Sequence, residues 1–429
     1  MRGAQEGEAW RPGLLIPSDG MKSAAFVLDN GMQAYVYPRP GLESVGIAIG
    51  VRYGSIDDRK EINGAAHYLE HMLFKGTTRR TAQDIKQEIR DIGVSWNAFT
   101  TFETTIYYMQ GYSMYFERMV DILSDMITNS TLPEEEFELE RGPVINEKLI
   151  HQDNPRFFFY DTFGKALYKR HPAMRPVGGS RECIERTTRN DLLSIYNSYY
   201  TPRNMIAAVY GNVGISGTKE TLERYIGRFS RKYKKLRRKV ANEPQVKTEL
   251  AIRKENLKQA RIGVGFKTLP CRKASMKEIV TLMVISKILS FRLFDEVRDR
   301  SGLSYDPSAN YYPFSTFGFI GAQAGAEPKK IGAVRKIMLD EIGKLGHGDI
   351  SRDEVERAKL GLSIQYRMQR ESTLDMANSI ASYALIMGSY RFVEDLPDMV
   401  GRVSVGDVKA YCSKYISAKK YSILVLKPS

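Results

Sequence analysis

An internal repeat is the feature of this sequence that most restricts its fold. Residues 87–111 contain the sequence pattern of a helix end, a turn and two strands, and residues 295–325 repeat that order. Within them, the segment 88–91 (EIRD) matches 296–299 (EVRD), 208 positions later. The chain is therefore predicted to be a duplicated unit, with one copy in each half.

Each half has the same sequence of predicted elements. Residues 44–55 and 259–270 are rich in small and β-branched residues, which is typical of buried strands. Residues 114–130 and 331–345 carry apolar side chains at helical spacing. We expect an α+β fold with two homologous domains, each a mixed, mostly antiparallel sheet with helices packed on one face.

A basic segment separates the two halves. The chain has 429 residues and a net charge of +14, and the segment 228–239 contains eight basic residues and no acid, which leaves 14 − 8 = +6 for the rest. We predict an N-terminal domain at 22–228, a solvated, mobile basic linker at 229–248 and a C-terminal domain at 249–429. Because much of the charge lies in the linker, a nucleic-acid binder is the weaker alternative, and we expect no nucleic-acid partner.

The sequence contains no signal for export or membrane insertion. No apolar stretch reaches the roughly 18 residues that a transmembrane helix needs. Residues 1–20 lack the apolar core of a secretory signal. Cys183, Cys271 and Cys412 are far apart, odd in number and without C-x-x-C spacing. We therefore predict free thiols in a cytoplasmic protein with no membrane partner.

The sequence HYLEHMLFKGT, which begins at His67, places two histidines on one predicted helix. Asn63 can cap this helix and Gly76 can end it. His67 and His71 are four residues apart and share a face, with Glu70 within one turn of both. Two such imidazoles can bind Zn²⁺, and the carboxylate can take a proton from water. An exposed helix face or a satisfied core histidine is the alternative for so short a motif.

A second predicted helix supplies further candidate ligands. Glu147 lies 147 − 71 = 76 positions beyond His71, and Glu140 precedes it by seven positions, two helical turns along the same face. Glu147 can complete the metal site while Glu140 orients a histidine through its second nitrogen. A solvated acidic helix face is the alternative, and it fits Glu140 better than it fits Glu147.

With these residues the chain resembles the pitrilysin/insulysin family of zinc peptidases. It is similar to the single-unit type, such as the catalytic subunit of the mitochondrial processing peptidase. The resemblance implies Zn²⁺ held by His67, His71 and Glu147, with Glu140 behind them and Glu70 as general base. NAFT resembles the family's substrate-binding edge strand (Asn97, Ala98, Phe99 and Thr100), and RDRSGLSY its pair Arg298 and Tyr305. Tyr305 would stabilise the oxyanion and Arg298 would hold the substrate backbone.

The resemblance also leads to an expectation about assembly. The second half contains a single histidine, His347, so one metal site per chain is expected. We predict a zinc-dependent endopeptidase that hydrolyses unfolded peptides in a chamber formed by two units. The partners would be peptide substrates and a second subunit, in a homodimer or in a heterodimer with a homologous chain. A noncatalytic or partner-dependent subunit of a peptidase complex is the alternative.

Overall fold

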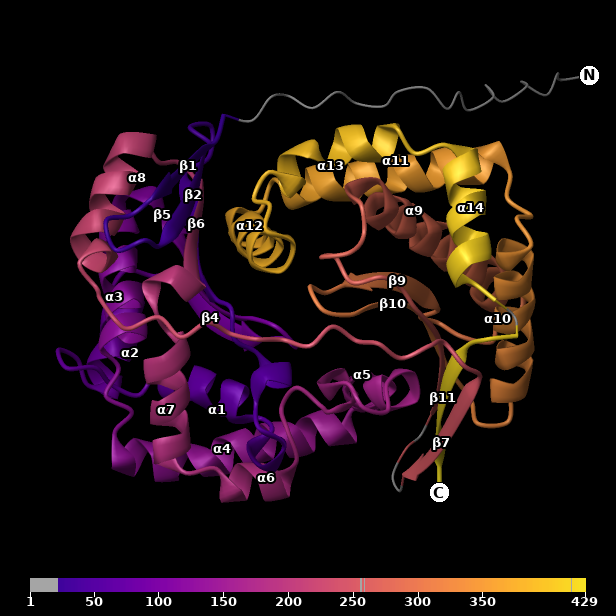
Figure 1. The fold of residues 1–429 in the computed structure, drawn as a ribbon, viewed down its shortest axis with the longest axis horizontal. Coiled ribbons are helices and arrows are strands. Elements are labelled where there is room, and N and C mark those ends of the chain that lie inside the picture. The colour runs from indigo at the N-terminus through magenta and orange to yellow at the C-terminus, as the bar shows by residue number, and fades with distance from the viewer. Residues whose placement is uncertain (1–21, 255–256, 258, 418) are drawn as a thin grey trace, which may run out of the picture.

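The computed structural model describes residues 22–429 except 255, 256, 258 and 418, and in this part the chain forms two sheets with helices around them (Figure 1). The strands of the first sheet are β1 (Ala24–Val27), β2 (Gln33–Pro38), β3 (Ser44–Val51), β4 (Ser95–Thr100), β5 (Thr105–Tyr112) and β6 (Met205–Gly211). The helices of this half are α1 (Ala65–Met72), α2 (Ala82–Asp91), α3 (Phe116–Asn129), α4 (Glu134–Asp153), α5 (Pro155–Leu167), α6 (Arg181–Arg186), α7 (Arg189–Tyr199) and α8 (Ile215–Leu222).

The second half has a similar set of elements. Its strands are β7 (Thr248–Lys254), β8 (Ala260–Lys267), β9 (Ser308–Pro313), β10 (Gly318–Ala326) and β11 (Ser422–Pro428). Its helices are α9 (Met276–Leu293), α10 (Ile331–Gly346), α11 (Arg352–Gln369), α12 (Thr373–Met387), α13 (Phe392–Gly401) and α14 (Val405–Tyr415). Local capping starts several of them: Ser351 accepts from the amide of Glu354, whose carboxylate accepts from the amide of Ser351.

The two sheets share one topology, which confirms the predicted α+β fold with two homologous domains. The first has the order β1-β2-β6-β3-β5-β4 and the second β7-β11-β8-β10-β9. Each sheet contains one parallel pair, β2 with β6 in the first and β7 with β11 in the second. The strands that follow are antiparallel, and the last two form a hairpin at the sheet edge, β4–β5 or β9–β10. The domain boundaries at 228/229 and 248/249 stay predictions.

The halves exchange one helix each, which the sequence did not reveal. α12 of the second half packs on β3, β5 and β6, and α5 of the first half packs on β7, β8 and β11 (Figure 1). Glycine permits both contacts, because a Cβ on Gly46 would lie 2.4 Å from the carbonyl oxygen of Thr373 and one on Gly263 would lie 2.1 Å from Phe159 Cζ. Each sheet therefore has one face covered by its own helices and the other by a helix of its neighbour.

The basic segment between the halves is anchored at two points. Residues 229–247 have no regular secondary structure. The guanidinium of Arg238 donates to both carboxylate oxygens of Asp57, at 2.8 and 2.6 Å, and to the carbonyl oxygen of Glu103. Arg231 donates to the carbonyl oxygens of Tyr196 and Tyr200. The prediction of a solvated, mobile linker is wrong at these two arginines, since paired cations fix the segment to the first half.

Glu103 joins the two edge hairpins. It lies in the β4–β5 turn and is fully buried. Its carboxylate accepts hydrogen bonds from the amides and hydroxyls of Ser315 and Thr316, in the β9–β10 turn. Phe102 packs edge-on against Phe317 beside this contact, with 5.5 Å between ring centroids. One carboxylate thus joins equivalent turns of the duplicated unit.

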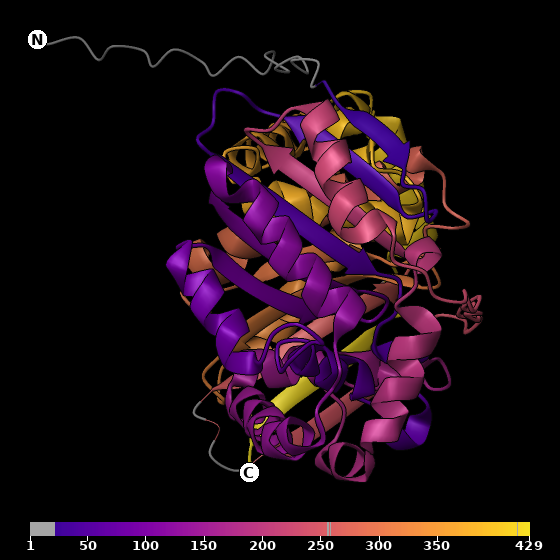
Figure 2. The same ribbon diagram turned by 90° about the vertical axis from the view of Figure 1, so that its left-hand side faces the viewer.

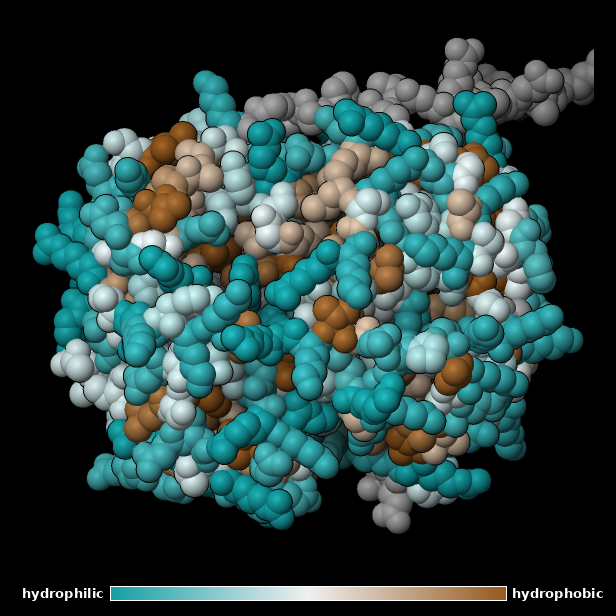
Figure 3. All heavy atoms as spheres, in the orientation of Figure 1, coloured by the Kyte–Doolittle hydropathy of each residue, from teal (hydrophilic) through white to brown (hydrophobic). Residues whose placement is uncertain are grey.

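The outer surface is polar around this frame. Figure 2 shows the helices of the first half covering the outward face of its sheet, and Figure 3 shows a largely hydrophilic face with scattered apolar groups. Within the described residues, no helix combines the length and the apolar composition that a bilayer crossing requires.

Arg238→Ala should lower the free energy of unfolding by about 3–5 kcal/mol, because it leaves the buried carboxylate of Asp57 without its cation. Denaturant titration would measure the change. Arg237→Ala is the control, since Arg237 is exposed on the same segment, and its effect should stay within about 0.5 kcal/mol. Equal losses for the two variants would contradict the anchoring role of Arg238.

Candidate metal centre

Helix α1 carries the two motif histidines, and its start is held by Asp58. The carboxylate of Asp58 accepts from the backbone amides of Gly64, at 2.9 Å, and Ala66, at 3.2 Å. Gly64 takes the N-cap position at φ 103°, a conformation that glycine adopts without strain. The expectation that Asn63 caps this helix is wrong, because its side chain makes no cap and the acceptor comes from an earlier loop.

Packing between α1 and α4 turns the histidine-bearing face of α1 toward α4. Tyr68 stacks on Phe137 of α4, with ring centroids 4.9 Å apart, and its hydroxyl donates to the carbonyl oxygen of Phe137. Because Tyr68 and Phe137 are fully buried, the two helices are fixed in register. His67 and His71 consequently face Glu140 and Glu147.

His67, His71 and Glu147 form a three-residue group with the geometry of a metal site. Their candidate ligand atoms all lie within 4.8 Å of one another, and this is the one such group among the described residues. Nε2 of His67 lies 3.5 Å from Oε1 of Glu147, and Nε2 of His71 lies 3.2 Å from Oε2. Tetrahedral zinc with ligand bonds of about 2.0–2.1 Å separates its ligand atoms by about 3.4 Å. The residues present therefore fit a zinc ion.

Glu140 orients His71 from behind. Its Oε1 accepts from Nδ1 of His71 at 3.0 Å, which leaves Nε2 as the ring atom that can bind a metal. Its other oxygen pairs with Nζ of Lys75. Burial alone would lower the pKa of His71, but its contacts with Glu140 and Glu147 raise it to about 9. The surroundings of this imidazole therefore favour a bound cation.

Glu70 lies beside the ligand set. It is 6% exposed, and its Oε2 accepts a hydrogen bond from the hydroxyl of Thr100, at the end of β4. Burial raises the pKa of Glu70, opposed by His67 and by the Thr100 hydroxyl. A desolvated carboxylate on the ligand face, held by a strand end, is suited to proton transfer rather than to structural pairing.

The structure places the remaining predicted site residues in two other locations. Asn97, Ala98, Phe99 and Thr100 form most of β4, which lies at the sheet edge and, within the described part of the chain, pairs only with β5. Arg298 lies over the ring of Tyr305, with 4.7 Å from its guanidinium carbon to the ring centroid. Tyr305 is 81% exposed, and among the described residues no contact joins this pair to the metal ligands.

Three residues near the candidate ligands were not predicted from the sequence. Lys75 follows His71 by four residues, so helical spacing could have placed it beside Glu140. His151 follows Glu147 by four residues, and its Nε2 lies 3.8 Å from Oε1 of Glu147. Asp58 left no local signal, because its role depends on a loop that returns to α1.

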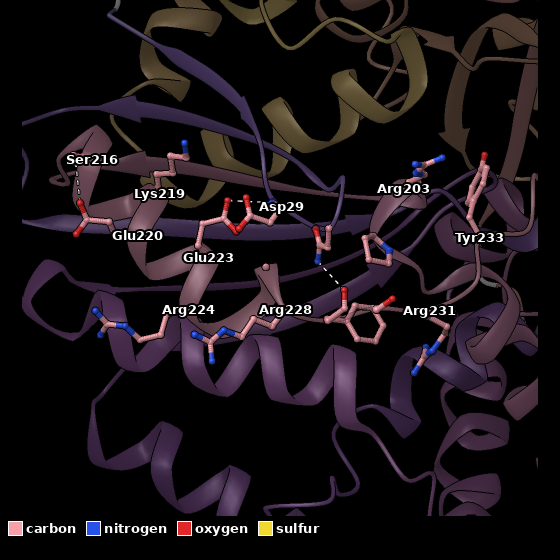
Figure 4. Close-up of a pocket in the computed structure, with 15 residues that line it drawn as sticks. Asp29, Arg203, Ser216, Lys219, Glu220, Glu223, Arg224, Arg228, Arg231 and Tyr233 are labelled. Carbon is pink, nitrogen blue, oxygen red and sulfur yellow. Dashed lines mark hydrogen bonds between the residues drawn. The ribbon is translucent and has the colours of Figure 1, made fainter.

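A surface depression of about 1240 Å³ lies elsewhere, between the start of the linker and α8 (Figure 4). Basic and acidic side chains both line it, and Glu223 accepts from the backbone amide of Asp29 at 3.2 Å. The absence of a nucleic-acid partner stays a prediction.

The fold has two related domains, and among the described residues the first domain holds one candidate His-His-Glu metal centre. The family model described as insulinase (peptidase family M16) matches residues 38–180, and the model described as peptidase M16 inactive domain matches residues 186–362. The chain belongs to this insulinase family. The match at residues 38–180 includes all the candidate metal-site residues, and the second half has no candidate metal group among its described residues.

Individual relatives are similar to this protein over nearly the whole chain. An uncharacterized zinc protease of Bacillus subtilis is 26% identical over 94% of this chain and 98% of its own length. An uncharacterized zinc protease of Mycobacterium leprae is 29% identical over 94% of this chain and 91% of its own length. The crystal structure of a protease from Helicobacter pylori superposes with a TM-score of 0.86 at 22% identity, covering 95% of this chain and all of that one.

Glu140→Ala should weaken zinc binding about 10- to 100-fold, because His71 loses the acceptor that fixes its tautomer. Titration against a chromophoric chelator would measure the affinity. Glu138→Ala is the matched control, since Glu138 is exposed on the same helix and pairs with Arg141. An unchanged affinity in Glu140→Ala would contradict the orienting role.

Proposed function

We propose that this protein is a zinc-dependent endopeptidase that hydrolyses unfolded peptides. The observation that carries the proposal is one group of side chains, in which His67, His71 and Glu147 suit a zinc ion while Glu70 lies beside them without being a ligand. The family match and the relatives' descriptions as zinc proteases support it.

The reaction divides between the metal and the side chains. A zinc ion in this site would supply Lewis acidity toward a water molecule and the peptide carbonyl. Glu70 accepts the proton as the water attacks, and then delivers it to the leaving amine. The Thr100 hydroxyl holds one oxygen of this carboxylate and leaves the other available for the proton. Glu140 keeps His71 in the tautomer that binds metal.

The substrate would bind as an added strand. β4 has a free edge, where backbone groups of residues 97–100 can pair with an extended peptide. Because Thr100 contacts Glu70, a peptide on this edge passes the proton-transfer group. Strand addition uses main-chain groups and requires an extended substrate, so unfolded peptides fit better than folded proteins.

Two copies would complete the site. Arg298 and Tyr305 contact each other, and among the described residues neither contacts the metal ligands, so a role for them at the metal would come from another chain. A second copy, or a homologous subunit, would supply them across an enclosed chamber. The same observation favours the alternative of a partner-dependent subunit. A cytoplasmic location stays a prediction.

Glu70→Gln should retain one zinc per chain and lose hydrolysis, because the amide cannot accept the proton and the residue is not a ligand. His67→Ala should lose both. Metal content by mass spectrometry and cleavage of quenched peptides, with chelator-treated wild type as control, give the two readouts. Loss of zinc from Glu70→Gln would show that its assigned role is wrong.

Mixing Glu70→Gln with Arg298→Ala after subunit dissociation should restore roughly a quarter of wild-type activity. Random pairing makes half of the dimers hybrid, and each hybrid has one complete site out of two. Subunit exchange is verified with two differently tagged copies. If proven exchange leaves activity at the level of the separate variants, the shared site is refuted.

A further inference from the structure

A small cavity lies between the two halves, close to the metal centre. Its volume is about 130 Å³, and aromatic rings from both halves line it. On one side Phe159 and Phe163 of α5 stack with centroids 5.2 Å apart, and on the other Tyr312 and Phe319 stack at 4.6 Å. A cavity of about 150 Å³ with apolar walls holds a benzene ring, so this space suits one aromatic ring.

One polar group in the wall lacks a partner. Gln323 of β10 lines the cavity and is only 5% exposed. Its Nε2 donates to the hydroxyl of Tyr160, but its Oε1 has no hydrogen-bond partner among the residues that the structure describes. Buried amides are normally paired at both ends, so the wall is complementary to a ligand with a hydrogen-bonding tip. A phenol hydroxyl both donates and accepts, and therefore pairs with either end of the amide.

The cavity adjoins the catalytic elements. Phe102, in its wall, follows Thr100 by two residues and lies in the β4–β5 turn. Val177, also in the wall, precedes Gly178, whose Cβ position would lie 3.9 Å from Nδ1 of His67. A peptide paired with β4 therefore passes this cavity close to the bond that faces Glu70.

We propose that the cavity is a specificity pocket that receives a tyrosine side chain of the peptide substrate, close to the cleaved bond. The inference rests on the proposed peptidase function. The ring would fill the aromatic walls, and its hydroxyl would pair with Gln323. Because both halves line the pocket, its shape depends on their fixed arrangement.

Matched quenched peptides that carry Tyr, Phe or Ala at each position around the cleaved bond test the proposal. At one position, wild type should cleave the Tyr peptide with a kcat/KM at least tenfold above Ala, and above Phe. Gln323→Leu should bring the Tyr-to-Phe ratio to about one and keep the preference for Phe over Ala, since the leucine cannot bond the hydroxyl.

Gly321→Val fills the cavity, since even a Cβ at this position lies 3.2 Å from Phe163 Cε1. It should remove the aromatic preference, measured as the ratio of kcat/KM for the Tyr and Phe peptides to kcat/KM for the Ala peptide. Ala251→Val is the control, because Ala251 is an exposed position of β7 in the same sheet. Thermal unfolding shows that each variant is folded, and p-cresol, the tyrosine side chain as a free molecule, should inhibit wild type but not Gly321→Val.

The outcomes separate the pocket from the proposed activity. Cleavage by wild type without aromatic preference, or with a preference that Gly321→Val leaves unchanged, overturns the pocket and leaves the peptidase standing. Inhibition by p-cresol without any peptide preference also overturns it, since the cavity would then be a site for a free small molecule. A zinc-loaded wild type that cleaves no peptide instead rejects the proposed function itself.

Discussion

The fully buried carboxylate of Glu103 is the constraint on which the arrangement of the halves depends. A buried carboxylate requires hydrogen-bond donors in the interior, and Ser315 and Thr316 in the opposite hairpin provide them. Arg238 of the linker donates to the backbone of the same residue and to Asp57. The adjacent Asp58 holds the start of α1. A continuous series of polar contacts thus runs from the second domain to the helix that bears the metal ligands.

Apolar packing of the exchanged helices also holds the two halves together. A sheet with one solvated face would be stable alone, but here α5 and α12 cover the second faces and belong to the opposite halves. The halves therefore cannot separate without exposing both sheets. This explains why a duplicated chain with one metal site retains its second unit, since that unit completes the support of the first and lines the cavity beside the site.

Those parts of the site that follow from helical spacing could be predicted from the sequence. His67 and His71 share a face because they are four residues apart, and Glu140 and Glu147 because they are seven apart. The duplicated sheets followed from repeated strand and helix patterns. Asp58, the anchoring of Arg238 and the exchanged helices could not be predicted in this way, because each depends on which segments meet after the chain has folded.

We propose that one zinc ion binds where α1 meets α4, and anomalous diffraction at the zinc edge from crystals of the zinc-loaded protein would locate it. We expect one anomalous peak per chain, about 2.0–2.2 Å from Nε2 of His67, Nε2 of His71 and a carboxylate oxygen of Glu147. A peak away from these atoms, or none at this position in protein that contains one zinc per chain, would contradict it.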